Sequence, residues 1–216
     1  MTYLQAVNKV LVRLRESTVA TVSETAYSAL IGEFVNDAKR AVEDSWNWGA
    51  LRTTLTVNTS AGVFNYVLTD SQQSITVLDV INDTSNWFMT PKTSSEFNNL
   101  FLNSTAVPET SPKWYTFNGV DSNGDTAIDV YPIPNGAYDL RFNVVLRTAD
   151  FENDADVFGV PTMPIIQLAT AFGARERGET GGTSSQELFA IADNTLADAV
   201  AFDAARFSDE TIWYTV

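Results

Sequence analysis

Cysteine and histidine are both absent from this chain of 216 residues. Without thiolate or imidazole side chains, it cannot form a cysteine or histidine metal site, a Ser-His triad or a cysteine nucleophile. Long apolar runs are absent too, because no stretch approaches the roughly 20 apolar residues of a membrane helix, and the N-terminus lacks the pattern of a secretion signal. The sequence therefore predicts a soluble, unexported protein without cofactor or metal, in which only carboxylates are left for polar chemistry.

Basic residues are scarce, with 13 lysines and arginines against 27 aspartates and glutamates and a formal net charge of −14. Proteins that grip a phosphate backbone usually carry a basic face, so this balance argues against tight DNA binding. An acidic surface also keeps a protein in solution, which is the simpler explanation of the charge. The hydrophobic content of 44% and aromatic content of 12% are sufficient for one large core or two small ones.

Helical patterns occupy both ends of the chain. Apolar residues recur at helical spacing in residues 3–15 and again in 26–48, where Ser23 is a candidate N-cap. The pattern returns from Thr162, after which the apolar residues of 165–174 and 188–202 predict two further helices. The sequence thus predicts four helices, two from each end.

The middle of the chain has the composition of β-structure, rich in threonine, valine and aromatic residues. Alternating apolar residues in 51–57 and 64–68 predict a β-hairpin, and a short helix is expected at 97–102. Turn residues at 121–124 and 134–136 separate further strands. Those strands are expected at 75–81, 87–89, 113–118, 126–131 and 137–146.

The predicted fold class is α+β: an antiparallel four-helix bundle from both chain ends with an inserted antiparallel β-sandwich or barrel-like domain. The expected helical domain comprises residues 1–50 and 160–207, the β-rich inserted domain residues 51–159, and a C-terminal arm residues 208–216. Trp46 and Trp48 lie where the helices meet the β-rich part, so they are expected to pack at this domain junction.

Several segments, in this order, resemble the tail tubular protein A adaptors of short-tailed phages (podoviruses). The likeness begins with residues 6–14 (AVNKVLVRL) and 18–22 (TVATV), and continues with Trp46-Asn-Trp48 before 53–57 (TTLTV). It extends through three later segments, 128–134 (IDVYPIP), 141–145 (RFNVV) and 160–164 (VPTMP). The resemblance covers most of the chain and is carried by the order of these segments.

What this resemblance implies is a structural virion protein and not an enzyme. It would form a head-to-tail adaptor ring, dodecameric in that family, with its helices facing the portal and its β part facing the tail nozzle. The DNA genome would pass through its channel during ejection without specific binding, and the implied partners are the portal, the nozzle, further copies of the chain and a tail fibre. The protein is then expected in the neck and tail of the virion, and in the host cytoplasm during assembly.

Seven residues are candidates for contacts with the portal or between subunits. Near the C-terminus stand the apolar residues Ile212, Trp213 and Tyr214. A chain end that contacts nothing is usually polar, so these residues are expected to bind a surface. The basic residues Arg13, Arg15, Lys39 and Arg40 on the first two predicted helices are candidates for pairing with an acidic neighbour, although exposed ion pairs contribute only about 0–1 kcal/mol each.

Three other functions stay open at this stage. A carbohydrate-binding β-sandwich module would use exposed Trp87, Trp114 and Tyr115, and a head-completion protein of long-tailed phages shares the strand-Pro-x-Pro pattern. A hydrolase would need paired carboxylates such as those in residues 152–156, but their composition is typical of a solvated linker.

Two sharper motifs are incomplete. Residues 173–180 have the glycine spacing of a P-loop, but Glu179 stands where the phosphate-binding lysine is required. Residues 121–125 alternate like a calcium loop, but Thr126 and Pro132 replace its glycine and glutamate, so a hairpin turn is expected.

Overall fold

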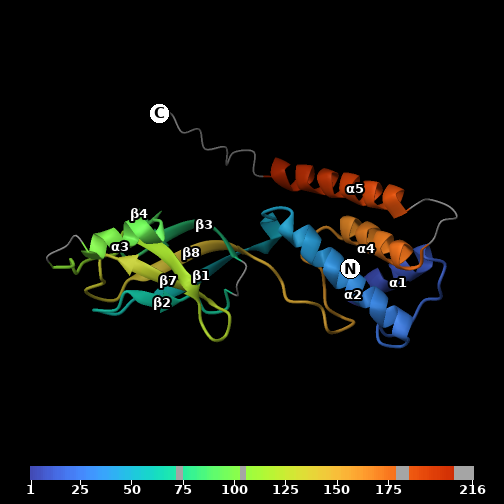
Figure 1. Cartoon of the computed structure of the whole chain (residues 1–216), viewed down its shortest axis with the longest axis horizontal. Helices are drawn as coiled ribbons and strands as arrows, with labels where there is room; N and C mark the ends of the chain where they lie inside the picture. Colours follow the sequence, from blue (N-terminus) through green and yellow to red (C-terminus); the bar gives the residue numbers. More distant parts are fainter. Residues whose placement is uncertain (72–74, 103–105, 179–184, 207–216) are drawn as a thin grey trace. The chain divides into compact units, whose positions relative to one another are not determined.

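The computed structural model describes residues 1–71, 75–102, 106–178 and 185–206 (Figure 1). The chain divides into two compact units, a helical unit of Met1–Leu51 with the chain from Arg147 onward, and a β unit of Arg52–Leu146. The chain is therefore a mixed α+β protein whose helical unit is assembled from both ends of the sequence. The β-rich domain was expected to reach residue 159, because residues 147–159 contain no helical pattern that would assign them to the helical unit.

Both helices at the N-terminal end begin at capping boxes. α1 (Tyr3–Arg13) follows Thr2, whose hydroxyl accepts from the backbone N–H of Gln5 at 3.3 Å. α2 (Ala26–Asp44) follows Thr25, which exchanges hydrogen bonds with Ser28 in the same way. The predicted cap Ser23 is wrong by two residues. A one-turn 3₁₀ helix, η1 (Gly49–Leu51), then leads out of the helical unit.

Two helices come from the C-terminal end, α4 (Thr162–Glu176) and α5 (Ser185–Ala205). α1, α2 and α4 pack on one another, and α5 lies along α4 (Figure 1). Gly32 and Gly173 allow this packing. A Cβ at Gly173 would lie 2.6 Å from a methyl carbon of Leu14. The predicted bundle placed all four helices around one core, whereas α5 packs chiefly on α4.

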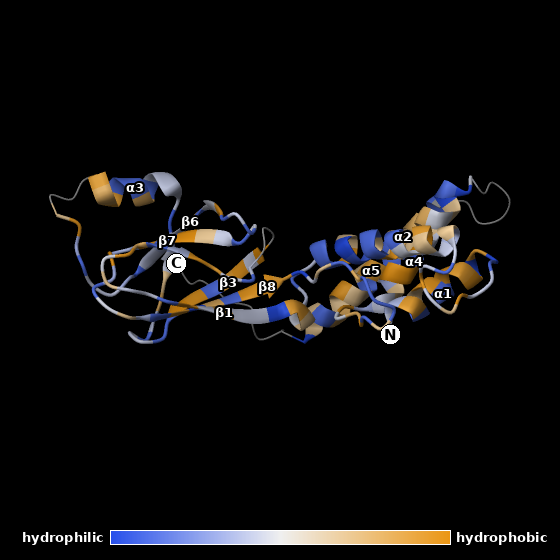
Figure 2. Ribbon diagram, turned by 90° about the horizontal axis from the view of Figure 1, so that it is seen from below, coloured by the Kyte–Doolittle hydropathy of each residue, from blue (hydrophilic) through white to orange (hydrophobic). Residues whose placement is uncertain are grey.

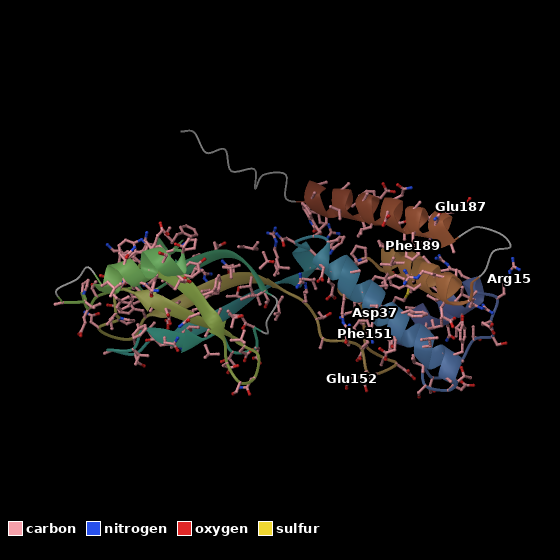
Figure 3. The ribbon with its side chains drawn as sticks, in the orientation of Figure 1. Arg15, Asp37, Phe151, Glu152, Glu187 and Phe189 are labelled. Atoms are coloured by element: carbon pink, nitrogen blue, oxygen red, sulfur yellow. The ribbon has the colours of Figure 1, made fainter. Side chains whose placement is uncertain are left out.

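Residues 147–161, which we call the return segment, are held against α2 by buried polar side chains. Lys39 Nζ donates to the carbonyl oxygens of Thr148 and Ala149 at 2.9 and 2.8 Å. The amide of Asn36 exchanges two 3.1 Å hydrogen bonds with the backbone of Phe151. Figure 3 shows Phe151 beside α2, and its ring centroid is 4.8 Å from Lys39 Nζ. Because these bonds satisfy backbone groups that no helix or sheet pairs, the segment can lie against α2 without regular structure, and it buries Phe151, Phe158 and Val160.

The β unit contains two four-stranded sheets. In the first, β1 (Arg52–Asn58), β8 (Asp139–Leu146), β3 (Ile75–Asn82) and β4 (Trp87–Phe88) are antiparallel in that order. In the second, the order is β2 (Asn65–Val67), β7 (Thr126–Tyr131), β6 (Trp114–Val120) and β5 (Thr90–Pro91). The short helix α3 (Ser94–Leu102), predicted at 97–102, contacts β6.

The core of the β unit draws buried side chains from both sheets, including Val80 and Phe142 from the first and Ile128 and Val130 from the second. Figure 2 shows apolar residues along β3, β7 and β8. Both sheets stay open over the described residues, so no barrel forms there. The arrangement is also not wholly antiparallel, since β5 and β6 run parallel.

The predicted hairpin of residues 51–57 and 64–68 is wrong, although both strands exist. β1 pairs with β8, and β2 pairs with β7 in the other sheet. The connection between β1 and β2 crosses from one sheet to the other because each strand directs its apolar side chains into the shared core. Neighbouring strands in a sequence often pair, but alternation alone does not identify the partner.

Candidate functional site

The helical unit carries an apolar groove of about 560 Å³ between the start of α4 and the C-terminal half of α5. We call it the α4–α5 groove. Its size lies in the range of binding pockets for a few large side chains or a small molecule. The apolar part of its lining comes from Trp48, Val160, Pro161, Met163, Ala199 and Phe202.

Asp203 fixes the C-terminal end of α5 at this groove. Its Oδ2 accepts from Trp46 Nε1 at 3.2 Å and from the backbone N–H of Gly49 at 2.9 Å. Trp48 is fully buried, and its Nε1 donates to the carbonyl oxygen of Val42 at 2.7 Å. The two tryptophans thus have different roles: Trp46 ties α5 to the end of α2, and Trp48 packs inside the helical unit.

Two large apolar side chains at this groove are open to solvent. Phe202 is 78% exposed and Met163 is 46% exposed. Exposed apolar side chains are common one by one, but their position beside an apolar hollow makes a continuous surface. Such a surface can bury an apolar segment of a partner or of the chain itself.

The predicted basic contact residues are not equivalent in the structure. Arg13 and Arg15 are exposed at the end of α1, and Figure 3 shows Arg15 pointing away from the helical unit. Arg40 is exposed but bonds to Asp150 through its guanidinium and lies 3.4 Å from Asp37. Its hydrogen bonds hold the pKa of Asp150 below the usual value.

Lys39 is completely buried and does not reach the surface of the helical unit. Its ammonium group lies 3.6 Å from the carboxylate of Glu43, in addition to its bonds to the return segment. Burial lowers the pKa of Lys39, and the nearby Glu43 carboxylate opposes that shift. Lys39 was expected at an interface because a single lysine in a helical pattern is usually exposed. In the structure its partners all lie within the helical unit.

The apolar residues of the C-terminal arm, Ile212, Trp213 and Tyr214, lie outside the described residues. The last described residue is Arg206, which itself lines the α4–α5 groove. The described part of the chain therefore ends at the groove.

The three aromatic residues that a carbohydrate-binding module would use do not form an exposed stacking surface on the β unit. Tyr115 is only 5% exposed and packs in the core. Trp114 and Trp87 are half-buried, with Lys92 Nζ and Lys113 Nζ over their rings at 5.7 and 5.4 Å from the centroids. A sugar stacks on an open ring face. The expected exposure of Tyr115 is therefore wrong, and the arrangement does not favour the carbohydrate-binding module.

Other apolar residues are exposed on the β unit, among them Phe88 at 71% and Leu102 at the end of α3. Phe97, Phe101 and Tyr131 form an aromatic cluster whose ring centroids are 5.2 to 6.2 Å apart. This cluster borders a hollow of about 330 Å³ whose lining includes Asp129. The Asp129 carboxylate is satisfied by the amide groups of Asn65 and Asn118, at 2.6 and 2.9 Å.

Sequence reasoning did not single out Asp203, Met163 or Phe88 as surface or site residues. Phe202 was assigned to an apolar helix face, because a phenylalanine in phase with other apolar residues is usually core. The sequence did contain a sign that some of these residues are exposed. α5 carries apolar residues around most of its circumference, so they cannot all face α4: Ala192 is buried, whereas the neighbouring Ile191 is exposed.

In the acidic segments 152–156 and 121–125, Asp156 and Asp121 accept hydrogen bonds from backbone groups close to them in the sequence. Asp156 Oδ2 accepts from the backbone N–H groups of Glu152 and Asn153 at 3.0 and 2.8 Å, and these bonds hold its pKa below the usual value. Asp121 Oδ1 accepts from the N–H groups of Asn123 and Asp125, closing the expected hairpin turn. No group of three or more metal-ligating side chains gathers among the described residues, and none of the helices described has the length and hydropathy to cross a membrane.

The family model described as SU10 adaptor protein matches residues 1–209, which includes both units. No curated protein matches the sequence.

Proposed function

Because the chain belongs to the SU10 adaptor protein family and is thus a structural protein of the phage head-to-tail connection, we propose that it forms a ring between portal and tail nozzle. In this proposal the helical unit binds the portal and the β unit binds the nozzle. The ring is a dodecamer, as in the tail tubular protein A adaptors of short-tailed phages that the sequence resembles. The adaptor lies at the neck of the virion.

The observation that carries this assignment is that each unit has a core of its own and exposes large apolar side chains. In the helical unit, Met163 and Phe202 lie at the α4–α5 groove. In the β unit, Phe88 and Leu102 are exposed. A protein whose two units each expose apolar side chains can bind a different partner through each unit, which is what joining a head to a tail requires.

The net charge of −14 supports passage of DNA through the ring. A channel that carried lysine and arginine would neutralise phosphates and release counterions, so that DNA would be held in a salt-dependent way. An acidic wall avoids that binding. The proposed channel therefore guides the genome without specific contacts.

Three exposed arginines and the arm are the proposed contact residues. Arg13 and Arg15 are exposed at the end of α1, and Arg40 is exposed beside Asp150. Ile212, Trp213 and Tyr214 would contribute apolar area to the portal or to the adjacent subunit. A tail fibre is a further proposed partner, through the β unit.

The test is to mix the purified protein with a purified portal ring and to determine mass and symmetry by light scattering and electron microscopy. The proposal expects a discrete ring, with twelve copies of this chain, stacked on the portal. Failure to associate at any salt concentration from low to physiological would contradict it. Proteins of this kind can remain monomeric without a template, because several weak contacts become favourable only together.

Substitutions separate the two ends of the adaptor. The double variant Arg13→Glu, Arg15→Glu should weaken portal binding at least tenfold and leave nozzle binding unchanged. Phe88→Asp should do the opposite. Lys113→Glu, a charge reversal at an exposed residue of the β unit, is the control for Arg13→Glu, Arg15→Glu and should leave portal binding unchanged. A head-completion role in a long-tailed phage would instead give portal binding without nozzle binding.

A further inference from the structure

The α4–α5 groove lies where the described chain ends. Arg206 is the last described residue and lines the groove together with Phe202 and Thr195, all of them on or just after α5. Ten residues follow, 207–216. The described chain therefore ends at the rim of an apolar hollow.

The chemistry of the groove suits an apolar segment. Its walls are largely apolar, and Phe202 and Met163 expose much of their side chains beside it. The nearby carboxylate of Asp203 is already bonded to Trp46 and Gly49, so it requires no polar partner from an occupant. A tryptophan that enters such a hollow buries about 150–250 Å² of surface, which is the largest gain any single side chain offers.

The arm has matching side chains within reach. Ile212, Trp213 and Tyr214 follow Arg206 by six to eight residues, a span of at most about 20–29 Å when extended. Ser208 and Asp209 are residue types that favour a turn, which the chain needs in order to fold back. The tether raises the effective concentration of the arm to about the millimolar range, far above that of any second copy in dilute solution.

From this combination we propose that the α4–α5 groove is the docking site for the C-terminal arm of the same chain, with Trp213 as the inserted side chain. In the free subunit the arm then covers Phe202 and Met163, and the groove in turn covers the apolar side chains assigned above to partner contacts. The docking itself does not depend on ring formation, but the arm has to leave the groove before these side chains can contact a partner.

The chain contains no cysteine, so the docking can be tested with introduced cysteines without competing native thiols. In the double variant Thr195→Cys, Thr215→Cys, one thiol lies in the groove and the other lies beside the inserted residues. In the control Asp193→Cys, Thr215→Cys, the helical thiol is two residues away on the exposed opposite side of α5. Both pairs are oxidised mildly at micromolar protein concentration without portal, and products are followed on non-reducing gels.

We expect the Thr195 pair to close within one chain at least tenfold faster than the Asp193 pair. Adding Phe202→Asp to the Thr195 pair should reduce its rate to that of the control, because a carboxylate in the groove opposes docking, and Phe202 is exposed enough for the fold to tolerate the change. Equal rates for both pairs would overturn the proposal. Disulfide-linked dimers as the main product would overturn it as well, since the groove would then take the arm of a second copy.

An independent measurement uses the full chain without cysteines. Deleting residues 208–216 should raise hydrogen exchange at α5 residues 199–203 at least tenfold, and Trp213→Phe should have part of that effect. Unchanged exchange in both variants would contradict docking. Because neither experiment contains portal or nozzle, failure here leaves the adaptor function intact, and failure of portal binding leaves the arm site intact.

Discussion

Lys39 and Glu43 lie one turn apart on α2, with Nζ 3.6 Å from Oε1 and both side chains excluded from solvent. The pair also holds the return segment, since Lys39 donates to two of its carbonyl groups and Glu43 accepts from the N–H and hydroxyl of Thr148. A buried ion pair is tolerated when such additional hydrogen bonds satisfy its remaining donors and acceptors. The pair therefore joins the two parts of the helical unit that come from opposite ends of the sequence.

Removing one member of this pair should be costly. Lys39→Met leaves Glu43 buried without its counter-ion and the carbonyls of Thr148 and Ala149 without donors, so we expect a loss of about 3–5 kcal/mol in the free energy of unfolding. Urea denaturation at pH 7 measures it. The control is Arg40→Ala, which removes an exposed ion pair on the same helix and should cost about 1 kcal/mol or less. Equal losses for the two variants would show that the burial of Lys39 is unimportant.

The approach of α1 to α2 depends on Gly32. A Cβ there would lie 2.5 Å from Tyr3 Oη and 2.8 Å from a methyl carbon of Val22. Gly32→Ala should therefore destabilise the protein by about 1–3 kcal/mol through overpacking. Thermal unfolding measures the loss, and Gly136→Ala, where a Cβ meets nothing within 4 Å, is the control. In the double variant with Tyr3→Phe the loss should shrink, because the closest contact is gone.

Tyr3 makes stability depend on alkaline pH. Burial, with smaller contributions from the carboxylates of Glu33, Asp150 and Asp154, raises its pKa from 10.0 to about 12. The folded state then binds the phenol proton more tightly than the unfolded state, so the stabilisation is complete below pH 10 and is lost as pH rises through about 12. The loss approaches about 3 kcal/mol for a shift of this size. Urea midpoints between pH 9 and pH 12 should fall more steeply for the native chain than for Tyr3→Phe.

Local patterns identified most elements of the fold. Helical spacing located α1, α2, α4 and α5, and strand patterns located every described strand except the two-residue β5, because each longer element buries one face whichever neighbour covers it. The partner of each strand could not be predicted from alternation. Leu55 and Tyr66 fit a hairpin as well as they fit two sheets, and only the shared core, which both residues contact, decides between these arrangements.

The surface residues were harder to predict for a physical reason. Lys39 and Arg40 are adjacent basic residues on one helix, yet one is fully buried and the other exposed, because the return segment covers only one side of α2. The covering segment has no periodic pattern and joins α2 from more than 100 residues away. A sequence pattern reports which face of a helix is apolar, but not which irregular segment packs over its polar residues.

The β unit should fold without the rest of the chain. Its core cluster draws only on residues within 52–146, and its two ends meet, since Arg52 pairs with Val145 across β1 and β8. We expect residues 52–146 expressed alone to show a β-rich circular dichroism spectrum and one cooperative urea transition. Phe142→Ala in the same fragment removes a fully buried core side chain and should abolish that transition or cost about 3–5 kcal/mol. A fragment without any cooperative transition would mean that the helical unit is required for folding.

Asp203 should control how firmly the C-terminal end of α5 is attached. Asp203→Ala leaves Trp46 Nε1 and the N–H of Gly49 without their acceptor, so we expect a loss of about 1–3 kcal/mol and faster hydrogen exchange in the last two turns of α5. Asp203→Asn keeps a side-chain oxygen that accepts from one or both donors and should have a smaller effect. Asp193→Ala, at an exposed position of the same helix, is the matched control. If Asp203→Ala and Asp193→Ala exchanged alike, the end of α5 would be held by its contacts with α4 alone.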